Sequence, residues 1–181
     1  MKSSFLDAVK NIFKYKPREP EFGETHFKNY NDFYGHFSIF YPKDWKCDPP
    51  VVIDEGGYAV VFHSKRSNSQ IRIGVETILP LKFNFKKYAK NEIESSSSGM
   101  LSKAHPSKFM GYPCFTATYQ YENEGRTFAG KRFIFYTGDR IFSIFYTYPA
   151  EEKNLEKTFS YICDSLIILP TRTKIFKCPT R

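Results

Sequence analysis

The sequence lacks an apolar run long enough to span a membrane, a C-x-x-C cysteine pair and a glycine-rich phosphate-binding motif. A spanning helix needs about 20 consecutive apolar residues, so no transmembrane segment is expected. Residues 1–17 also show no signal-peptide core and no small-residue cleavage site. We therefore expect a cytoplasmic protein with reduced thiols.

The cysteines show no spacing that is typical of zinc ligands. Four are present, at Cys47, Cys114, Cys163 and Cys178. Cys114 lies in a strand-like run, and Cys163 lies on the apolar face of a helical pattern. We interpret both as small buried hydrophobic residues.

Acidic residues are fewer than basic ones, and the formal net charge is +8. This balance favours acidic partners in a general way, such as nucleic acid, anionic lipid or an acidic protein surface. Residues 171–181 contain four basic residues and no acid, so they carry half of the excess. We interpret this basic C-terminal tail as a solvated chain end.

Aromatic residues are abundant: 19 Phe, 13 Tyr and one Trp make up 18% of the chain. Most lie in short alternating runs that are typical of strands, so they favour a β-rich core. Period-two patterns predict strands at 37–41, 58–62, 71–77, 107–110, 114–121, 127–136 and 140–148. The last four are joined by short turns, so we expect them to pair antiparallel.

Helical periodicity predicts three helices. The first covers residues 3–16, ends at Pro17 and is followed by a polar connector to about Asn31. The second is capped by Asn84 and runs to about Ser95, and the third covers 151–167. The strands at 133–136 and 141–146 are apolar on both faces, so they need cover on both sides. We therefore predict an α+β fold, a three-layer α/β/α sandwich with a central, mainly antiparallel sheet.

The order of these elements and several short motifs resemble the PsbP-like family. The segment GHFSIFYPKDW at 35–45 is similar to the opening strand of that family, which ends in Pro-x-x-Trp. GYPCF at 111–115, GDRIF at 138–142 and DSL at 164–166 fall where the family has a glycine, a final hairpin and a helix end. The resemblance covers roughly residues 28–169 and implies an α/β/α sandwich in which Trp45 anchors the strand end.

The PsbP-like family includes an extrinsic photosystem II subunit and a Ran-GTPase-binding nuclear import factor. The resemblance therefore implies an accessory binding protein without a catalytic centre, and no metal or partner residue is carried over. We predict residues 1–27 as an N-terminal amphipathic helix and connector, 28–170 as the PsbP-like domain and 171–181 as a basic tail.

No arrangement typical of catalysis or of a metal site is visible. The histidines at 26, 36, 63 and 105 have no metal-ligand spacing, and we interpret them as surface residues. His63 with Asp54 or Asp139, or the thiol of Cys47, could be placed around a nucleophile, but no catalytic motif supports this. We predict no enzyme activity, no catalytic residue, no cofactor and no metal.

The N-terminal helix is the strongest candidate for a partner-binding element, because its apolar face must be buried somewhere. It either folds back on the domain or docks on a partner or an anionic membrane surface. The candidate partner-binding residues are Phe5, Leu6, Val9, Ile12, Phe13, Lys10 and Lys14. Deletion of 1–17 separates these readings, since only packing within the chain would lower the melting temperature.

Three functions are compatible with the sequence. The leading prediction is a non-catalytic binding or accessory module that recognises a protein or another macromolecule. An alternative is an enzyme or binder of a small anionic ligand, with Arg72, Lys131 or Arg132 as anion clamps. A second alternative is nucleic-acid or anionic-membrane binding through the basic surface, with Lys131, Arg132 and Arg140 among alternating aromatics.

Overall fold

The computed structural model describes residues 26–54, 56–64, 66–78, 83–95, 100–101 and 104–170. These residues form an α+β fold, which is mostly antiparallel sheet with two helices. The fold divides into two compact units, a smaller one from the described parts of Met1–Tyr41 and Ser160–Arg181 and a larger one, Pro42–Phe159. The predicted helix at 3–16 and the basic tail at 171–181 lie outside the described residues. The predicted domain boundaries stay predictions.

The smaller unit holds a three-stranded sheet of order β1-β2-β12 among the described residues. Its strands are β1 (Phe27–Asn31), β2 (Phe37–Pro42) and β12 (Ile167–Ile168). The predicted strand at 37–41 is confirmed by β2, in which Phe37 and Ile39 are fully buried. The prediction of a connector up to Asn31 is wrong, because β1 occupies its end.

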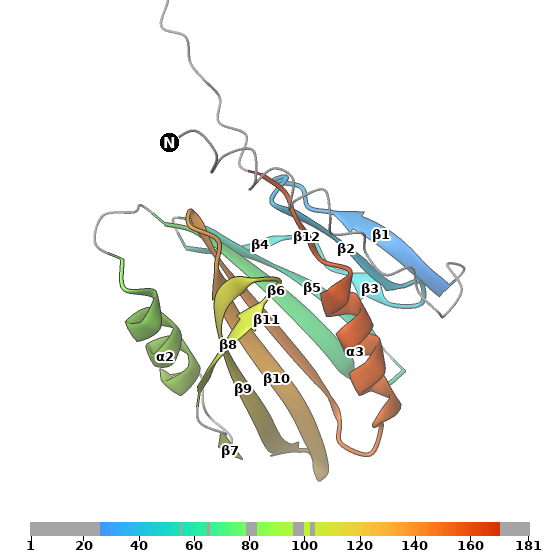
Figure 1. Ribbon diagram of the computed structural model, residues 1–181. Coiled ribbons are helices and arrows are strands. Elements are labelled where there is room, and N and C mark those ends of the chain that lie inside the picture. The colour runs from blue at the N-terminus through green and yellow to red at the C-terminus, as the bar shows by residue number, and fades with distance from the viewer. Residues whose placement is uncertain are drawn as a thin grey trace, which may run out of the picture. The chain divides into compact units, whose positions relative to one another are not determined.

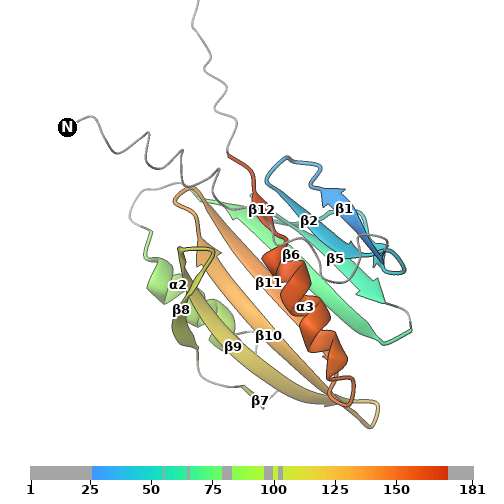
Figure 2. The ribbon, with the colours of Figure 1, turned by 45° about the vertical axis from the view of Figure 1, so that its right-hand side comes forward.

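The larger unit is built on nine strands in the described part of the chain, in the order β3-β5-β6-β11-β10-β9-β7, with β4 on β5 and β8 on β9. Their bounds are β3 (Lys46–Cys47), β4 (Val51–Asp54), β5 (Gly57–Ser64), β6 (Ser69–Thr77), β7 (Met100–Leu101), β8 (His105–Phe109), β9 (Tyr112–Asn123), β10 (Arg126–Tyr136) and β11 (Arg140–Pro149). Figures 1 and 2 both show the long strands β9, β10 and β11 side by side.

The predicted antiparallel pairing of the long strands is confirmed. The turn between β10 and β11 has the predicted three residues, whereas the turn between β9 and β10 is shorter than predicted. Between β9 and β10 only Glu124 and Gly125 remain, with φ of 50° and 74°. Two consecutive positive φ angles are typical of the tight hairpin turn whose twist matches that of the strands, and glycine adopts them without strain. The strands therefore extend further than their hydrophobic runs alone indicated.

Helix α2 (Phe85–Ser95) begins where the sequence predicted it. The backbone N–H of Lys87 donates to the side-chain oxygen of Asn84 at 3.0 Å, which confirms the N-cap. Ala89 and Ile93 on this helix are buried against Phe115 and other residues of the sheet. One face of the sheet is therefore covered by α2.

Helix α3 (Asn154–Asp164) is shorter than the predicted 151–167. It ends before β12, in which Ile167 pairs with Ser38. In the larger unit, the Phe159 ring stacks on Tyr146 with centroids 4.4 Å apart and meets Trp45 edge-on at 5.5 Å. Trp45 is 4% exposed, so the prediction that it packs at the strand end is confirmed.

The strands β10 and β11 are buried on both faces, as predicted. The consecutive residues Ile134 and Phe135 are both fully buried although their side chains point to opposite sides of the sheet. The sequence did not predict β3, β4 or β7, which are short and sit at the margins of the sheet. Neither described helix has the length and apolarity needed to cross a membrane.

Candidate functional site

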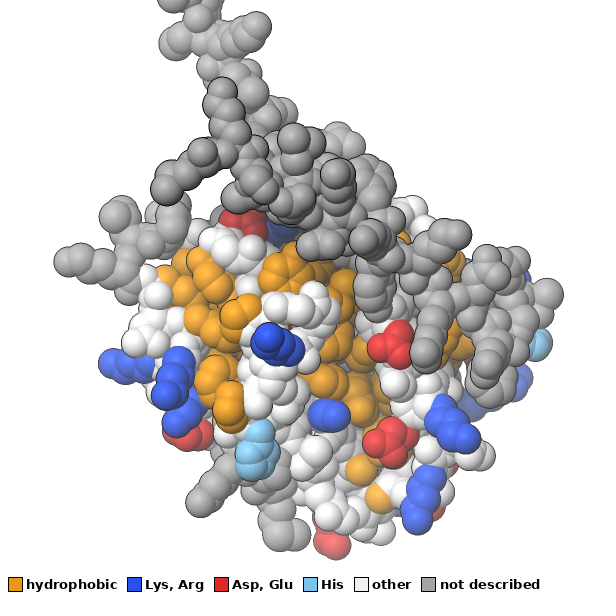
Figure 3. Space-filling model, in the orientation of Figure 1, with side chains coloured by type: hydrophobic (Ala, Val, Ile, Leu, Met, Phe, Trp, Pro, Cys, Tyr) orange, Lys and Arg blue, Asp and Glu red, His pale blue; other side chains and the backbone are white. Residues whose placement is uncertain are grey.

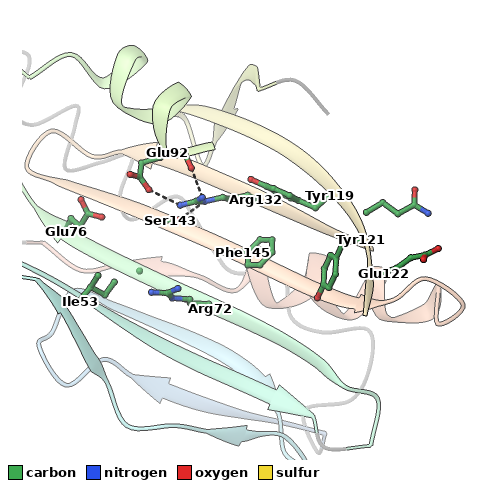
Figure 4. A pocket seen from close by; sticks show the side chains of 12 residues that line it. Ile53, Arg72, Glu76, Glu92, Tyr119, Tyr121, Glu122, Arg132, Ser143 and Phe145 are labelled. Carbon is green, nitrogen blue, oxygen red and sulfur yellow. Dashed lines mark hydrogen bonds and ion pairs between the residues drawn. The ribbon is translucent and has the colours of Figure 1, made fainter. Parts of the chain in front are cut away.

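A pocket of about 550 Å³ opens on the face of the sheet that carries α2 (Figure 4). Its lining residues come from β4, β6, α2, β9, β10 and β11. They are Ile53, Arg72, Gly74, Glu76, Glu92, Tyr119, Gln120, Tyr121, Glu122, Arg132, Ser143 and Phe145. Pockets of about 300–1,000 Å³ are typical of small-molecule sites.

The pocket exists because small residues meet in the middle of the sheet. The register places Gly74 of β6 directly opposite Ser143 of β11, so that neither contributes a large side chain to this face. A Cβ atom added at Gly74 would find Ser143 Cβ at 3.7 Å, which is ordinary van der Waals contact. The space above Gly74 is therefore open, and a larger side chain there would fill it.

Arg132 joins α2 to the sheet at one wall of the pocket. Its guanidinium donates to the backbone carbonyl of Glu92 at 2.9 Å and lies 3.3 Å from the Glu92 carboxylate. It also donates to the Ser143 hydroxyl at 3.2 Å. The Arg132 side chain is 14% exposed and that of Glu92 is 40% exposed, so the ion pair is shielded from water at its arginine end.

A second polar contact connects α2 to β6. The Tyr88 hydroxyl donates to the Glu76 carboxylate at 2.7 Å. Burial raises the pKa of Tyr88 strongly, and the hydrogen bond and negative charge of Glu76 raise it further. Tyr88 therefore stays neutral as a donor at physiological pH, and Glu76 is held in place by it.

Arg72 is the second cation of this pocket, and its surroundings differ from those of Arg132. It lies on β6, where the register places it opposite Phe145, and Phe145 is in turn opposite Arg132. Arg72 is exposed, and its guanidinium makes no ion pair or hydrogen bond with any residue that the structure describes. Arg132 has a carboxylate partner, whereas Arg72 is available to a ligand.

Aromatic rings form another wall. Tyr119 of β9 meets Phe145 edge-on, with centroids 5.3 Å apart, and is 9% exposed. Its hydroxyl is buried and completes no hydrogen bond within the described part of the chain. Burial raises the pKa of Tyr119, and the positive charge of Arg132 and a weak hydrogen-bonding interaction with its guanidinium oppose this rise. A guanidinium can only donate, so the proton of the Tyr119 hydroxyl is left without an acceptor among the described residues.

The structure brings together only two of the three predicted anion clamps. Arg72 and Arg132 line the pocket. Lys131 neighbours Arg132 on β10 and therefore points to the opposite face, where its ammonium lies 5.0 Å from the Phe133 ring centroid. Arg140 is buried and paired with Asp139 at 3.2 Å, so these cations form no shared stacking platform for nucleic acid.

The structure also differs from the catalytic arrangement of His63 with Asp54 or Asp139, or with Cys47, that the sequence analysis considered. The carboxylate that contacts His63 is Asp48, at 3.1 Å. Cys47 pairs with Phe62, the residue before His63, so the Cys47 and His63 side chains point to opposite faces. Within the described ranges, no group of three or more His, Cys, Asp or Glu residues is placed to hold a metal ion.

Other predicted residues fall as follows. Cys114 and Cys163 are 2% and 4% exposed, which confirms their burial. The candidate partner-binding residues of the N-terminal helix lie outside the described residues.

Sequence reasoning missed Tyr119 and Glu92 as pocket residues. The sequence of β6 did contain a signal. The alternate residues Arg72, Gly74 and Glu76 lie on one face of this strand, and the glycine leaves space between two charged side chains.

The comparisons with known proteins show a likeness of fold. No family model and no curated protein matches the chain. A solved structure from Bacteroides thetaiotaomicron is 19% identical, with a TM-score of 0.55 over 81% of this chain and 50% of that one. The chain thus spans about half the length of that protein.

The match to this chain covers almost the whole length of two further solved structures. The solution structure of cyanobacterial PsbP (CyanoP) from Synechocystis is 16% identical, with a TM-score of 0.54 over 82% of this chain and 96% of that one. LpqN, involved in cell envelope biogenesis of Mycobacterium tuberculosis, is 12% identical, with a TM-score of 0.53 over 80% and 92%. The chain resembles PsbP at the level of the fold.

Proposed function

We propose that this chain is a non-catalytic binding or accessory module, and that the pocket above Gly74 and Ser143 is its recognition site. The observation that carries the proposal is the division of polar groups in the pocket. Arg132, Glu92 and Glu76 are engaged in holding α2 to the sheet, whereas Arg72 remains open to a ligand. A preformed cavity with a few available polar groups is typical of a ligand site.

The engagement of the two inner carboxylates supports a role in binding rather than in catalysis. A general acid or base must reach the reacting proton of a substrate. The Glu92 carboxylate is turned towards Arg132, and the Glu76 carboxylate towards the Tyr88 hydroxyl. Both carboxylates therefore stabilise the packing of α2 on the sheet.

We also propose that the fold is a three-layer sandwich, with helices on both faces of the larger sheet. Ala89 and Ile93 of α2 pack on the face that carries Ile134. Phe159 packs on Tyr146, which points to the opposite face from its neighbour Phe145. In this arrangement the pocket belongs to the α2 side.

The likeness to CyanoP and LpqN supports an accessory role at the level of fold alone. Neither name describes a reaction. The described part of the face in Figure 3 offers no concentrated basic surface for a membrane or nucleic-acid partner. On the described part of the face in Figure 3, hydrophobic side chains gather over β8, β9 and β10, and basic and acidic side chains are scattered around them.

A protein partner is a second candidate, favoured by one observation. Val51, Val52 and Ile53 of β4 are 62%, 66% and 47% exposed. Among the described strands β4 pairs only with β5, so its outer edge is open. Three consecutive exposed apolar residues on an edge strand are typical of a docking strip.

The test is a screen of small fragments by ligand-observed NMR against wild type and Gly74→Val. The new side chain starts in ordinary contact distance of Ser143, so the variant should fold and lose space in the pocket. Ala129→Val is the control, because Ala129 lies on the opposite face of β10 from Arg132. We expect hits that Gly74→Val abolishes and Ala129→Val keeps; no hits, or hits indifferent to Gly74→Val, would overturn the proposal.

A further inference from the structure

We infer that the ligand of this pocket is a small aromatic monocarboxylate, with its carboxylate on Arg72 and its ring against Tyr121 and Phe145. This inference rests on the proposed function and names the chemistry of the ligand at the same site. It is carried by Arg72, which has no partner among the described residues, by the buried hydroxyl of Tyr119 and by the aromatic wall.

The charge of the ligand follows from the pairing of the pocket residues. Arg132 forms an ion pair with Glu92, and the neutral Tyr88 hydroxyl fixes the position of the Glu76 carboxylate without cancelling its charge. Arg72 forms no ion pair with a described carboxylate, so it is the cation that a ligand can pair with. A guanidinium presents parallel N–H donors that fit the two oxygens of a carboxylate.

The number of negative charges on the ligand is limited as well. Glu76, Glu92 and Glu122 all line the pocket, so a dianion such as a phosphate monoester would meet carboxylates with only one unmatched cation to oppose them. Like charges within one pocket repel each other, and burial strengthens the repulsion. The site therefore favours one negative charge over two.

The Tyr119 hydroxyl supplies a second polar contact. It lines the pocket, its oxygen is buried, and none of the residues that the structure describes accepts its proton. Buried polar groups in folded proteins nearly always have a partner. A ligand atom that accepts a hydrogen bond would provide that partner, and the positive charge of Arg132 beside the hydroxyl also favours an acceptor.

The body of the ligand is set by the side chains between the polar groups. In Figure 4 the rings of Phe145 and Tyr121 lie between Arg72 and Glu122. Ile53 adds an apolar contact from β4. Aromatic rings pack against one another in offset or edge-on geometry, and a pocket of about 550 Å³ accepts a ligand with one or two rings.

The test is isothermal titration of the full-length protein with phenylacetate and indole-3-acetate. Phenylacetamide and phenyl phosphate serve as the matched neutral and dianionic compounds. We expect the carboxylates to bind at least about tenfold more tightly than either, because a charge-assisted hydrogen bond is lost with the amide and repulsion is added with the phosphate.

Variants assign the contacts. Arg72→Gln should weaken carboxylate binding about tenfold or more and abolish the preference over the amide, while Arg66→Gln, at an exposed arginine in the β5–β6 turn, should change nothing. Tyr119→Phe should weaken binding a few-fold. Circular dichroism establishes that each variant is folded.

Three results would overturn the inference: no carboxylate binding at millimolar concentration, equal binding of the amide, or unchanged binding by Arg72→Gln. If fragments of other chemistry still bind wild type and fail with Gly74→Val, the ligand class is wrong and the proposed function stands. If no fragment responds to Gly74→Val, both fail.

Discussion

Arg72 and Arg132 stand opposite the same residue, Phe145, from the two strands that flank β11. Their surroundings differ sharply. Arg132 is 14% exposed and holds Glu92 and Ser143, whereas Arg72 is exposed and makes no such contact among the described residues. One arginine therefore supports the pocket and the other is left to recognise a ligand.

The first prediction concerns the supporting arginine. Arg132→Gln should lower the free energy of unfolding by about 2–3 kcal/mol, because it removes the ion pair of a mostly buried arginine and leaves the Glu92 carbonyl without its donor. Urea denaturation measures the loss. Arg126→Gln is the control: its ion pair with Glu151 is shorter, at 2.6 Å, but exposed, so no measurable loss is expected. A larger loss in the control would contradict this account of Arg132.

The second prediction concerns stability at alkaline pH. The pKa of Tyr88 is raised in the folded state, chiefly by burial and then by Glu76. Its contribution to stability is thus fully present below the unfolded tyrosine pKa of about 10 and is lost as pH rises above it, since only the unfolded state then releases the proton. Tyr88→Phe should be less stable at pH 7 and lose less stability between about pH 9 and 11. Parallel wild-type and variant curves over this range would count against the assignment.

The third prediction concerns the aromatic core. Phe159 is fully buried against Tyr146, Trp45 and Tyr148. Phe159→Ala should cost about 3–5 kcal/mol of stability through lost contacts and the cavity left behind. Phe33→Ala is matched in chemistry but 82% exposed, and it should have almost no effect in the same denaturation experiment.

The fourth prediction concerns thiol reactivity. Burial raises the pKa of Cys114, and the residue is 2% exposed, so its reactive thiolate is scarce and shielded. In a Cys178→Ser background, Ellman's reagent at pH 8 should modify Cys47, which is half-buried, well before Cys114. Adding Cys47→Ser should remove the fast phase; a fast phase that persists would contradict the ranking.

The sequence predicted the long hairpins because their signals are local. Alternating apolar residues and a Gly at 125 define β9 and β10 without reference to distant parts of the chain. The strands β1, β4 and β12 have weaker local signals. β12 has two residues and exists through its pairing with β2, more than a hundred positions earlier, so the helical periodicity before it was extended too far.

The pocket could not be predicted as a whole, because it depends on register. Gly74 and Ser143 are 69 positions apart, and only the pairing of β6 with β11 places them opposite each other. The sequence did single out Arg72 and Arg132 as anion-binding residues. It could not show that Lys131 points away or that Glu92 already pairs with Arg132, since both depend on the arrangement of β10 and α2.

The most direct test of the central claim is to measure intermolecular NOEs between the tightest-binding fragment and the aromatic side chains of the protein. Recognition in the pocket predicts contacts to Tyr119, Tyr121 and Phe145. The rings of Phe109 and Phe133, which pack together on the opposite face of the sheet, should show none. NOEs to Phe109 and Phe133 with none to the pocket rings would contradict the account.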